Sequence, residues 1–459
     1  MPRVHTLKIS ISGVRGVVGD FLTPQLIETF AKAFGTFTGQ GRITVGRDTR
    51  TSGEMFLHAV CSGLLSTGCI PVDLGICPTP SAQIRTKETE AVGGIIITAS
   101  HNPAQWNALK FIGKNGRFLD EYESRSLVEL YHEGNFRRCP DEEINKVRQD
   151  PHAIESHLQK VLDYVDVDLI RSKRFKVAFD CCNGAGSLMT PRLLQEFGCQ
   201  LIPINTEPNG IFPREPEPTP QHLTQLCSTT KLSGADIGFA QDADADRLAI
   251  VNEQGEPIGE DYTLALVVQF VLSKTPGPVV VNLSTSRIIE DIAQHYHCQV
   301  YRTKIGESNV IDKLLVCQAV VGGEGNGGVM IPAIHPCRDS FIGIGLVLQF
   351  MAETGNSVSE LVNNLPRYFM VKRKISLPSE KIFGIIDTLK QQYASAHIDV
   401  TDGLKILLDD RNAWIHVRPS NTEPILRIVS EATSREDAEA LNEQIVKEAG
   451  LSLSTHTPR

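Results

Sequence analysis

The sequence has no hydrophobic run long enough to cross a membrane, which excludes a helical integral membrane protein. Residues 1–8 lack the long apolar core of an export signal. Basic side chains are in the minority, with 45 lysines and arginines against 54 aspartates and glutamates, and the net charge is −9. Nucleic acid and an anionic membrane surface are therefore not expected as partners. We expect a soluble cytoplasmic protein.

The chain also lacks a CxxC pair, although it contains 11 cysteines. These cysteines are scattered, mostly in apolar surroundings, and the adjacent Cys181 and Cys182 have the character of small buried residues rather than a redox pair. An odd number of cysteines without an export signal is typical of the reducing cytoplasm.

Short β-branched segments alternate with amphipathic helical patterns, which favours α/β layers, and 459 residues suffice for several domains. Strands are predicted at 43–46, 95–97, 177–180, 279–282, 320–323, 414–417 and 426–429. The last two strands belong to a smaller α+β unit. A polar stretch at 138–151 and a turn at 255–257 mark possible boundaries. The predicted domains are 1–150, 151–255, 256–370 and 371–459.

The junction after the predicted strand at 95–97 is the most informative feature of the chain. The segment 98–103, Thr-Ala-Ser-His-Asn-Pro, follows this apolar run and turns sharply. The hydroxyl of Ser100 is therefore expected at the end of a buried strand, where reactive groups gather in open α/β sheets. A serine beside a histidine is weak evidence alone, but a second polar site later in the chain strengthens it.

That second site is the alternating triplet Asp242, Asp244 and Asp246. This spacing is not a helical charge stripe, because neighbours on a helix are three or four residues apart. In an extended or looped segment the three carboxylates point the same way and are able to converge on one hard cation. The flanking apolar runs, 237–240 and 248–251, predict a hairpin. A solvated acidic loop is the alternative, but clustered like charges beside apolar strands are costly, so we expect a divalent metal, Mg²⁺.

Four motifs together resemble those of the α-D-phosphohexomutase superfamily, the phosphoglucomutase and phosphomannomutase enzymes. They are the serine loop 98–103, the aspartate loop 242–247, the glycine-rich loop 322–328 and the loop 418–424. The resemblance covers essentially the whole chain. It implies three similar mixed α/β domains and a C-terminal α+β domain around a central cleft.

The resemblance also implies an isomerase that interconverts hexose 6-phosphate and hexose 1-phosphate through a phosphoserine and a hexose 1,6-bisphosphate, which also acts as activator. Glucosamine phosphate is the favoured substrate, and a phosphoglucomutase/phosphomannomutase of broad specificity is the alternative. A metal-dependent sugar phosphatase and a non-catalytic sugar-phosphate-binding protein are the competing classes.

In this family Ser100 would carry the phosphate and complete the Mg²⁺ ligand set with the three aspartates. His101 would contact the phosphoserine or the substrate, or else only shape the turn. Lys110 is a candidate general acid/base or a phosphate-binding cation, and Arg15 aligns with a family arginine near the phosphoserine. Arg247 would bridge to phosphate or pair with Asp246.

The glycine-rich loop corresponds to the family's sugar loop, in which Glu324 and Asn326 would bond sugar hydroxyls. Lys304 lies in a segment that matches a substrate-contacting loop, and Glu307 there replaces a histidine found in some members. The last loop would hold the non-reacting phosphate. Its predicted ligands are Arg418, Ser420, Asn421 and Thr422, with Arg427 as a weaker helper.

Two further segments match the family but are interpreted as structural. Arg47 and Asp48 are expected to form a salt bridge at the end of a strand. Arg338 and Asp339 are expected to be a structural pair at another strand end.

Overall fold

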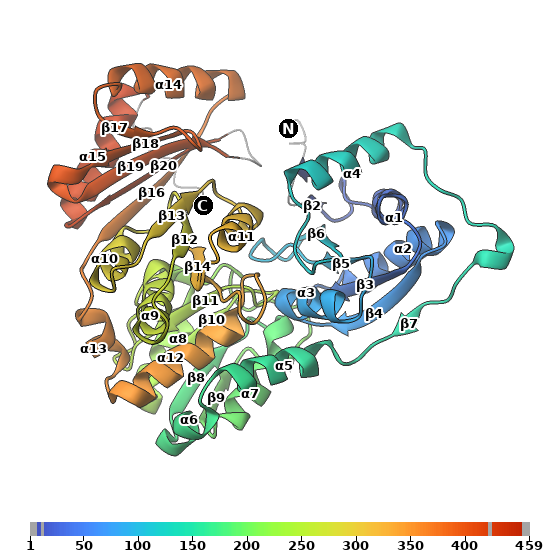
Figure 1. Cartoon of the computed structure of the whole chain (residues 1–459), viewed down its shortest axis with the longest axis horizontal. Helices are drawn as coiled ribbons and strands as arrows, with labels where there is room; N and C mark the ends of the chain where they lie inside the picture. Colours follow the sequence, from blue (N-terminus) through green and yellow to red (C-terminus); the bar gives the residue numbers. More distant parts are fainter. Residues whose placement is uncertain (1–6, 11–12, 421–424, 452–459) are drawn as a thin grey trace.

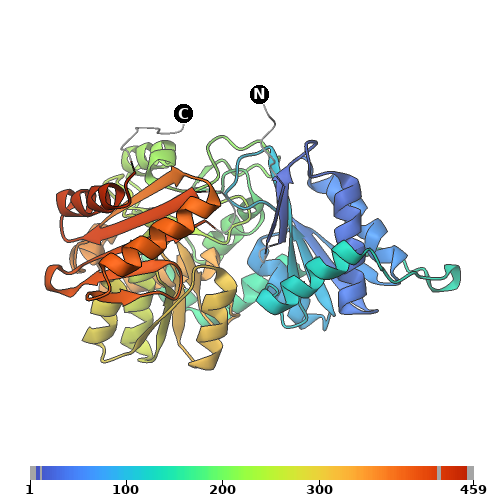
Figure 2. The same cartoon turned by 90° about the horizontal axis from the view of Figure 1, so that it is seen from above.

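A computed structural model describes residues 7–10, 13–420 and 425–451 of the chain. The chain forms four sheets with their covering helices, as Figure 1 shows. We number the four units I to IV in chain order. Figures 1 and 2 show unit I beside units II and III, with unit IV against unit III.

Unit I is built on a seven-stranded sheet of order β1-β2-β6-β5-β3-β4-β7. Its strands are β1 Lys8–Ser10, β2 Gly13–Val17, β3 Arg42–Arg47, β4 Ile70–Ile76, β5 Gly93–Ile97, β6 Trp106–Gly113 and β7 Arg148–Gln149. Its helices are α1 Pro24–Thr38, α2 Gly53–Ser66, α3 Thr79–Glu88 and α4 Glu121–Glu133. Ile95 and Ile97 belong to the core beneath α1 and α2, whereas Ile96 belongs to the core that contains Ala82 of α3. The apolar run of β5 is continuous because helices cover both faces of the sheet.

Unit II has a four-stranded sheet of order β11-β10-β8-β9. Its strands are β8 Lys176–Asp180, β9 Gln200–Ile204, β10 Ile237–Gln241 and β11 Leu248–Val251, and its helices are α5 Ala153–Tyr164, α6 Val167–Lys173, α7 Thr190–Glu196 and α8 Thr224–Ser233. The predicted hairpin is confirmed, because β10 and β11 pair antiparallel with Gln241 opposite Leu248. The aspartate loop connects these two strands.

Unit III repeats this plan in a sheet of order β13-β12-β14-β15. Its strands are β12 Val279–Asn282, β13 Val300–Thr303, β14 Val321–Glu324 and β15 Gly328–Met330. Its helices are α9 Glu260–Lys274, α10 Ile288–His295, α11 Glu307–Val316, α12 Ser340–Thr354 and α13 Val358–Asn363. The glycine-rich loop connects β14 to its antiparallel neighbour β15.

The serine, aspartate and glycine-rich loops therefore occupy the same topological position. In each unit the loop follows a strand with a parallel neighbour and leads into an antiparallel strand, which gives the pairs β5–β6, β10–β11 and β14–β15. The expected three similar mixed α/β units are confirmed. Loops at the carboxyl ends of parallel strands are the usual location of binding sites in such sheets.

Unit IV is the expected α+β unit, a five-stranded antiparallel sheet of order β16-β20-β19-β18-β17. Its strands are β16 Phe369–Ser376, β17 His397–Asp399, β18 Leu404–Leu408, β19 Ala413–Pro419 and β20 Ile425–Ala432, and its helices are α14 Ser379–Gln392 and α15 Arg435–Glu448. Ile386 of α14 and Ile445 of α15 pack into the same core as alternate residues of β19 and β20. Both helices therefore cover one face of the sheet, which agrees with Figure 2.

The opposite face of the unit IV sheet contacts unit III through buried polar groups. Lys405 donates to the carbonyl oxygen of Leu283 at 2.7 Å, and His416 lies 2.8 Å from the hydroxyl of Ser284. Glu431 accepts the backbone N–H of Arg287 at 2.9 Å. Polar contacts of this kind define one orientation of unit IV on unit III, because each buried group needs its partner.

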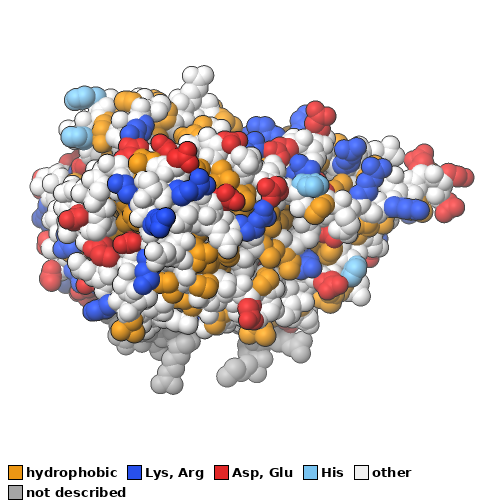
Figure 3. All heavy atoms as spheres, turned by 90° about the horizontal axis from the view of Figure 1, so that it is seen from below, with side chains coloured by type: hydrophobic (Ala, Val, Ile, Leu, Met, Phe, Trp, Pro, Cys, Tyr) orange, Lys and Arg blue, Asp and Glu red, His pale blue; other side chains and the backbone are white. Residues whose placement is uncertain are grey.

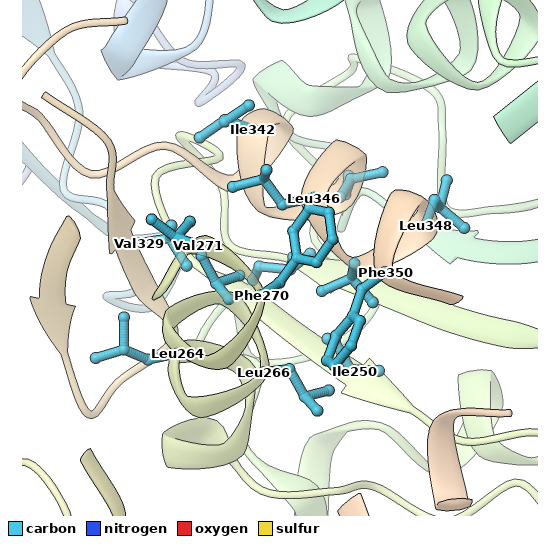
Figure 4. Close-up of a cluster of buried hydrophobic side chains, with 14 of the residues drawn as sticks. Ile250, Leu264, Leu266, Phe270, Val271, Val329, Ile342, Leu346, Leu348 and Phe350 are labelled. Atoms are coloured by element: carbon cyan, nitrogen blue, oxygen red, sulfur yellow. The ribbon is translucent and has the colours of Figure 1, made fainter. Parts of the chain in front are cut away.

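Units II and III share one hydrophobic core (Figure 4). Helices α9 and α12 lie at its centre, and α12 is buried on almost every side. Its residues are correspondingly apolar all round, the pattern of a helix that lies between layers rather than on a surface. Leu348 of α12 is fully buried in this core together with Phe270 of α9.

All eleven cysteines are free thiols. None of the helices in the described part of the chain combines the length and apolarity that a membrane crossing requires. On the face drawn in Figure 3, positive and negative side chains are interspersed among apolar ones.

We expect Leu348→Ala to lower the free energy of unfolding by about 2–5 kcal/mol, because it removes buried methyl groups and leaves a cavity in the core that units II and III share. Leu232→Ala is the matched control, since that leucine is 86% exposed, and its effect should stay within about 0.5 kcal/mol. Urea unfolding followed by circular dichroism measures both. Equal midpoints for the two variants would contradict this account of the core.

Candidate active site

The serine loop holds Ser100 in an uncommon backbone conformation. Ser100 has a φ of 49°, in the left-handed region that residues other than glycine seldom adopt. Its backbone N–H donates to the hydroxyl oxygen of Thr98 at 2.9 Å. This turn directs the Ser100 hydroxyl away from unit I, where it donates to Oδ2 of Asp242 at 2.7 Å. The two predicted loops, 142 positions apart, thus meet at one hydrogen bond.

His101 lies within the same cluster. Its Nδ1 is 3.3 Å from the Ser100 hydroxyl oxygen. Burial, followed by repulsion from Arg247 and Arg15, places the pKa of His101 well below its usual range. His101 is therefore a neutral ring at neutral pH, suited to a hydrogen bond rather than to charge pairing.

Asp242, Asp244 and Asp246 converge as predicted. Their ligand oxygens lie within 4.8 Å of one another, and all three residues are buried. Burial, followed by repulsion from Asp244 and Asp246, raises the pKa of Asp242 well above its usual range. Such a cluster needs positive charge nearby, so a solvated acidic loop does not describe it.

Each carboxylate is oriented by a specific partner. Asp242 accepts the backbone N–H of Asp246 at 3.1 Å through Oδ1. Oδ2 of Asp244 accepts the Lys110 ammonium at 2.9 Å and the Thr79 hydroxyl at 2.7 Å. Oδ1 of Asp244 and Oδ1 of Asp246 are buried without a hydrogen-bond partner.

These unpaired oxygens fit a hard divalent cation. Buried carboxylate oxygens without partners are rare in proteins, and oxygen ligands of this type suit Mg²⁺. The chemistry of the aspartate cluster therefore makes it a candidate metal-binding site. The hydroxyl of Ser100 lies at its edge, bonded to Asp242.

Cationic side chains surround the cluster. Arg15 of β2 donates to Oδ1 of Asn102 at 2.6 Å. Burial, followed by repulsion from Arg247 and Arg50, lowers the pKa of Arg15 to about 10.

Arg247 lies 3.9 Å from Oδ1 of Asp246 and 3.5 Å from Glu217. These distances agree with the ion pair to Asp246 that the sequence offered as one role of Arg247.

The glycine-rich loop packs directly against the β10–β11 hairpin that carries the aspartate loop. Gly327 has a φ of 83°, and a Cβ atom there would lie 2.2 Å from the carbonyl oxygen of Leu248. Glu324 accepts Nδ2 of Asn282 at 2.9 Å. The side chain of Asn326 accepts the N–H of Gly328 at 3.2 Å and so stabilises its own turn.

Arg338 is more than the structural strand-end residue that the sequence suggested. Its guanidinium contacts Asp246 at 2.5 Å, Glu324 at 2.9 Å and Glu307 at 3.1 Å. It thereby links a carboxylate of the aspartate loop to the glycine-rich loop.

Asp339 has a separate role, because it caps α12 by accepting the N–H of Phe341 at 2.8 Å.

The expected salt bridge between Arg47 and Asp48 is also wrong. The carboxylate of Asp48 pairs with Arg50 at 3.0 Å, because Arg50 reaches beneath the serine loop. Arg50 and Thr79 are contacts of the serine and aspartate loops that the sequence reasoning missed. Their only sequence signal is their position just after strands of the first sheet.

Two of the proposed sugar contacts lie apart from the serine–aspartate cluster. In the described chain, neither Lys304, which is exposed after β13, nor Asn326 forms a hydrogen bond or ion pair with it. Glu307 begins α11, and burial raises the pKa of its carboxyl group to about 7.

The predicted phosphate loop lies at the end of unit IV. Arg418 of β19 is opposite Arg427 of β20, and the N–H of Ser420 donates to the carbonyl oxygen of Ile425 at 3.0 Å. Burial lowers the pKa of Arg418. The other two predicted ligands, Asn421 and Thr422, lie outside the described residues.

Four family descriptions match the chain in order. They are phosphoglucomutase/phosphomannomutase alpha/beta/alpha domain I at 7–138, domain II at 155–255, domain III at 259–369 and the C-terminal domain at 377–448.

Curated relatives extend over almost the full length. A "Phosphoglucomutase/phosphomannomutase" of Thermococcus kodakarensis is 40% identical over 93% of this chain and 94% of its own. A "Probable phosphoglucosamine mutase" of Methanopyrus kandleri is 37% identical over 95% and 96%. A crystal structure of a phosphoglucomutase/phosphomannomutase family protein from Burkholderia thailandensis superposes with a TM-score of 0.85 at 24% identity, covering 96% of this chain and 97% of that one.

We expect Asp244→Asn to weaken Mg²⁺ binding by about tenfold or more, roughly 1.4 kcal/mol, because it removes one negative charge and one carboxylate ligand. Isothermal titration with MgCl₂ measures the affinity. Asp150→Asn is the control, since Asp150 pairs with Arg85 in unit I at 2.8 Å. Equal Mg²⁺ affinity in the Asp244 variant and the wild type would show that the cluster is not the metal site.

Proposed function

From the premise that this chain belongs to the phosphoglucomutase/phosphomannomutase family of α-D-phosphohexomutases, we propose that Ser100 carries the transferred phosphate and that glucosamine phosphate is the preferred substrate. The chain is an isomerase that interconverts hexose 1-phosphates and hexose 6-phosphates. What remains to be assigned is the role of each residue and the identity of the sugar.

One observation carries the assignment of Ser100. Its hydroxyl lies 2.7 Å from Asp242, at the edge of a buried triplet of carboxylates. Phosphoryl transfer depends on in-line positioning and on neutralisation of the phosphoryl charge. A serine held at a divalent-metal site provides both.

Asp242, Asp244 and Asp246 would hold Mg²⁺, and a phosphate on Ser100 would supply a further oxygen ligand. When bound, Mg²⁺ stabilises the charge of the transferring phosphoryl group. Arg15 and Arg247 flank this position and are suited to contact phosphate oxygens through their planar guanidinium groups.

Lys110 is the proposed proton carrier. Its ammonium group lies 2.9 Å from Asp244, within the same cluster as Ser100, and it is buried. In this position it presents a transferable proton near the oxygen atoms that exchange phosphate. His101, a neutral ring beside the serine hydroxyl, would orient that hydroxyl by hydrogen bonding.

The non-reacting phosphate requires a second anion site, which we assign to unit IV. Arg418 and Arg427 lie opposite each other on the adjacent strands β19 and β20. Phospho-Ser100 would phosphorylate the sugar to a 1,6-bisphosphate, which turns over and returns its other phosphate to Ser100. A phosphatase would need no second site of this kind, so the pair of arginines favours the mutase over that alternative.

The names of several relatives and the charge around the sugar loop support glucosamine. Glu307 and Glu324 share one guanidinium, that of Arg338, with Asp246, so three carboxyl groups meet one cation here. An aminosugar ammonium group complements such a surface. The relative from Thermococcus kodakarensis favours the alternative, a broad phosphoglucomutase/phosphomannomutase.

We place the enzyme in the cytoplasm, where its eleven free thiols stay reduced. A hexose 1,6-bisphosphate would serve there as the activator that first phosphorylates Ser100.

Ser100→Ala should abolish turnover, because no other hydroxyl in the described part of the chain bonds to Asp242. Coupled-assay activity with glucose 1-phosphate, and intact-protein mass spectrometry after incubation with glucose 1,6-bisphosphate and Mg²⁺, should show no turnover and no added phosphate. Ser126→Ala, at a half-buried serine of α4 outside the serine loop, is the control. Retained turnover in Ser100→Ala would exclude the phosphoserine pathway.

Glu307→Gln should lower kcat/KM for glucosamine 1-phosphate by about tenfold while changing that for glucose and mannose 1-phosphates by less than about threefold. The reason is that an amide cannot neutralise the ammonium group of the aminosugar. Side-by-side kinetics of wild type and variant on the three substrates provide the measurement. Comparable wild-type turnover of all three sugars would instead establish the broad mutase.

A further inference from the structure

We propose that Arg50 is a positioning residue, which holds the serine loop in the backbone conformation that places the Ser100 hydroxyl at the metal site. Arg50 lies outside the four motifs. Among the described residues it forms no hydrogen bond or ion pair with the aspartate loop 242–247 or with the glycine-rich loop 322–328. This inference rests on the proposed role of Ser100 as phosphate carrier.

The guanidinium of Arg50 donates mainly to carbonyl groups within the serine loop and just after it. Nη2 donates to the carbonyl oxygens of Ser100 and Asn102, each at 2.7 Å. Nη1 donates to those of Pro103 at 2.7 Å and Trp106 at 2.9 Å. With Nε bonded to Asp48, every N–H of the group has an acceptor. A single planar cation thus gathers four carbonyl groups of one turn.

This turn needs such a clamp because its conformation is strained. A non-glycine residue at the φ of Ser100, 49°, is strained, and this conformation persists only where the surrounding contacts over-determine it. Without the clamp, Ser100 would relax toward an ordinary conformation and carry its hydroxyl away from Asp242. Reactions that depend on positioning lose much of their rate from shifts of about 1 Å.

Asp48 closes the clamp into a ring of hydrogen bonds. Its carboxylate accepts Nε of Arg50 at 3.0 Å and the hydroxyl of Thr98 at 2.6 Å. The hydroxyl oxygen of Thr98 in turn accepts the N–H of Ser100 at 2.9 Å. Both sides of Ser100, its N–H and its carbonyl group, are therefore held by the same buried ion pair.

Unit II covers the clamp. The guanidinium carbon of Arg50 lies 4.9 Å from the ring centre of Phe212, and Thr49 donates to the carbonyl oxygen of Asn183 at 2.8 Å. Arg50 is only 2% exposed. The clamp thus connects the serine loop to unit II, which carries the aspartate loop.

Lysine cannot replace arginine here, because it has fewer donors and no planar fork.

Arg50→Lys is the test. We expect kcat to fall by about a hundredfold or more, with KM for the sugar phosphate changed by less than about threefold, because positioning of the serine is lost while the substrate contacts remain. Hydrogen–deuterium exchange of the peptide 98–106 should rise by about tenfold or more, since its carbonyl anchors are gone. The rate of phosphate transfer from glucose 1,6-bisphosphate to Ser100 should fall in parallel with kcat.

Arg85→Lys is the matched control. Arg85 is also an arginine of unit I that pairs with a carboxylate, Asp150, but away from the serine loop. A kcat in Arg50→Lys within threefold of the wild type, or equal losses in the two variants, would overturn the proposal. Should Arg50→Lys fail to fold, Thr98→Val opens the same ring, and unchanged kcat and exchange in that variant would overturn it.

Failure of the proposed phosphoserine pathway would look different. It would show as turnover retained in Ser100→Ala, whereas the exchange of the peptide 98–106 reports on the clamp without any substrate. Raised exchange in Arg50→Lys together with an unphosphorylated but active Ser100→Ala would overturn the catalytic consequence assigned to Arg50.

Discussion

The central constraint on this protein is the repulsion among three buried carboxylates. Asp242, Asp244 and Asp246 crowd their ligand oxygens within 4.8 Å, in a place that water does not reach. Isolated like charges are not stable there, so their neighbours must supply positive charge or hydrogen-bond donors. Lys110 from unit I and Arg338 from unit III answer this requirement, and both reach the cluster from other units. These ion pairs with the aspartate loop thereby hold units I, II and III together.

The three α/β units bring their functional loops together because each uses the same topological position. A loop that leads from the last parallel strand into an antiparallel strand emerges at the carboxyl end of its sheet. In the proposed function each loop would carry one chemical task, with Ser100 in the first, the aspartates in the second and Glu324 in the third. Repetition of one plan explains how a long chain assembles a site whose parts are more than a hundred residues apart.

Unit IV joins this arrangement through a polar interface rather than a shared apolar core. Lys405, His416 and Glu431 are buried against the segment 283–287 of unit III, and each depends on one partner there. Interfaces of this kind define an orientation while costing less to open than a packed hydrophobic core. In the proposed reaction, a sugar that turns over between two phosphate transfers would need a unit that can move, and unit IV is the one held in this way.

Sequence alone determined the features that depend on local pattern. The apolar run before Ser100 predicted β5, the apolar runs at 237–240 and 248–251 predicted the hairpin, and the spacing of Asp242 to Asp246 predicted the converging carboxylates. Hydrophobic periodicity and charge spacing extend over only a few residues, so the amino-acid sequence contains all the information that these predictions need.

Tertiary structure alone decided which distant groups complete those motifs. Arg338 meets Asp246 across 92 positions, and Arg50 gathers carbonyl groups about 50 positions away, so no local pattern distinguishes either from a structural arginine. Asp48 pairs with Arg50 rather than with Arg47, because the fold places the Arg50 guanidinium beneath the serine loop, beside the buried carboxylate. Local sequence specifies which groups can react, and only the packing of the units specifies what surrounds and holds them.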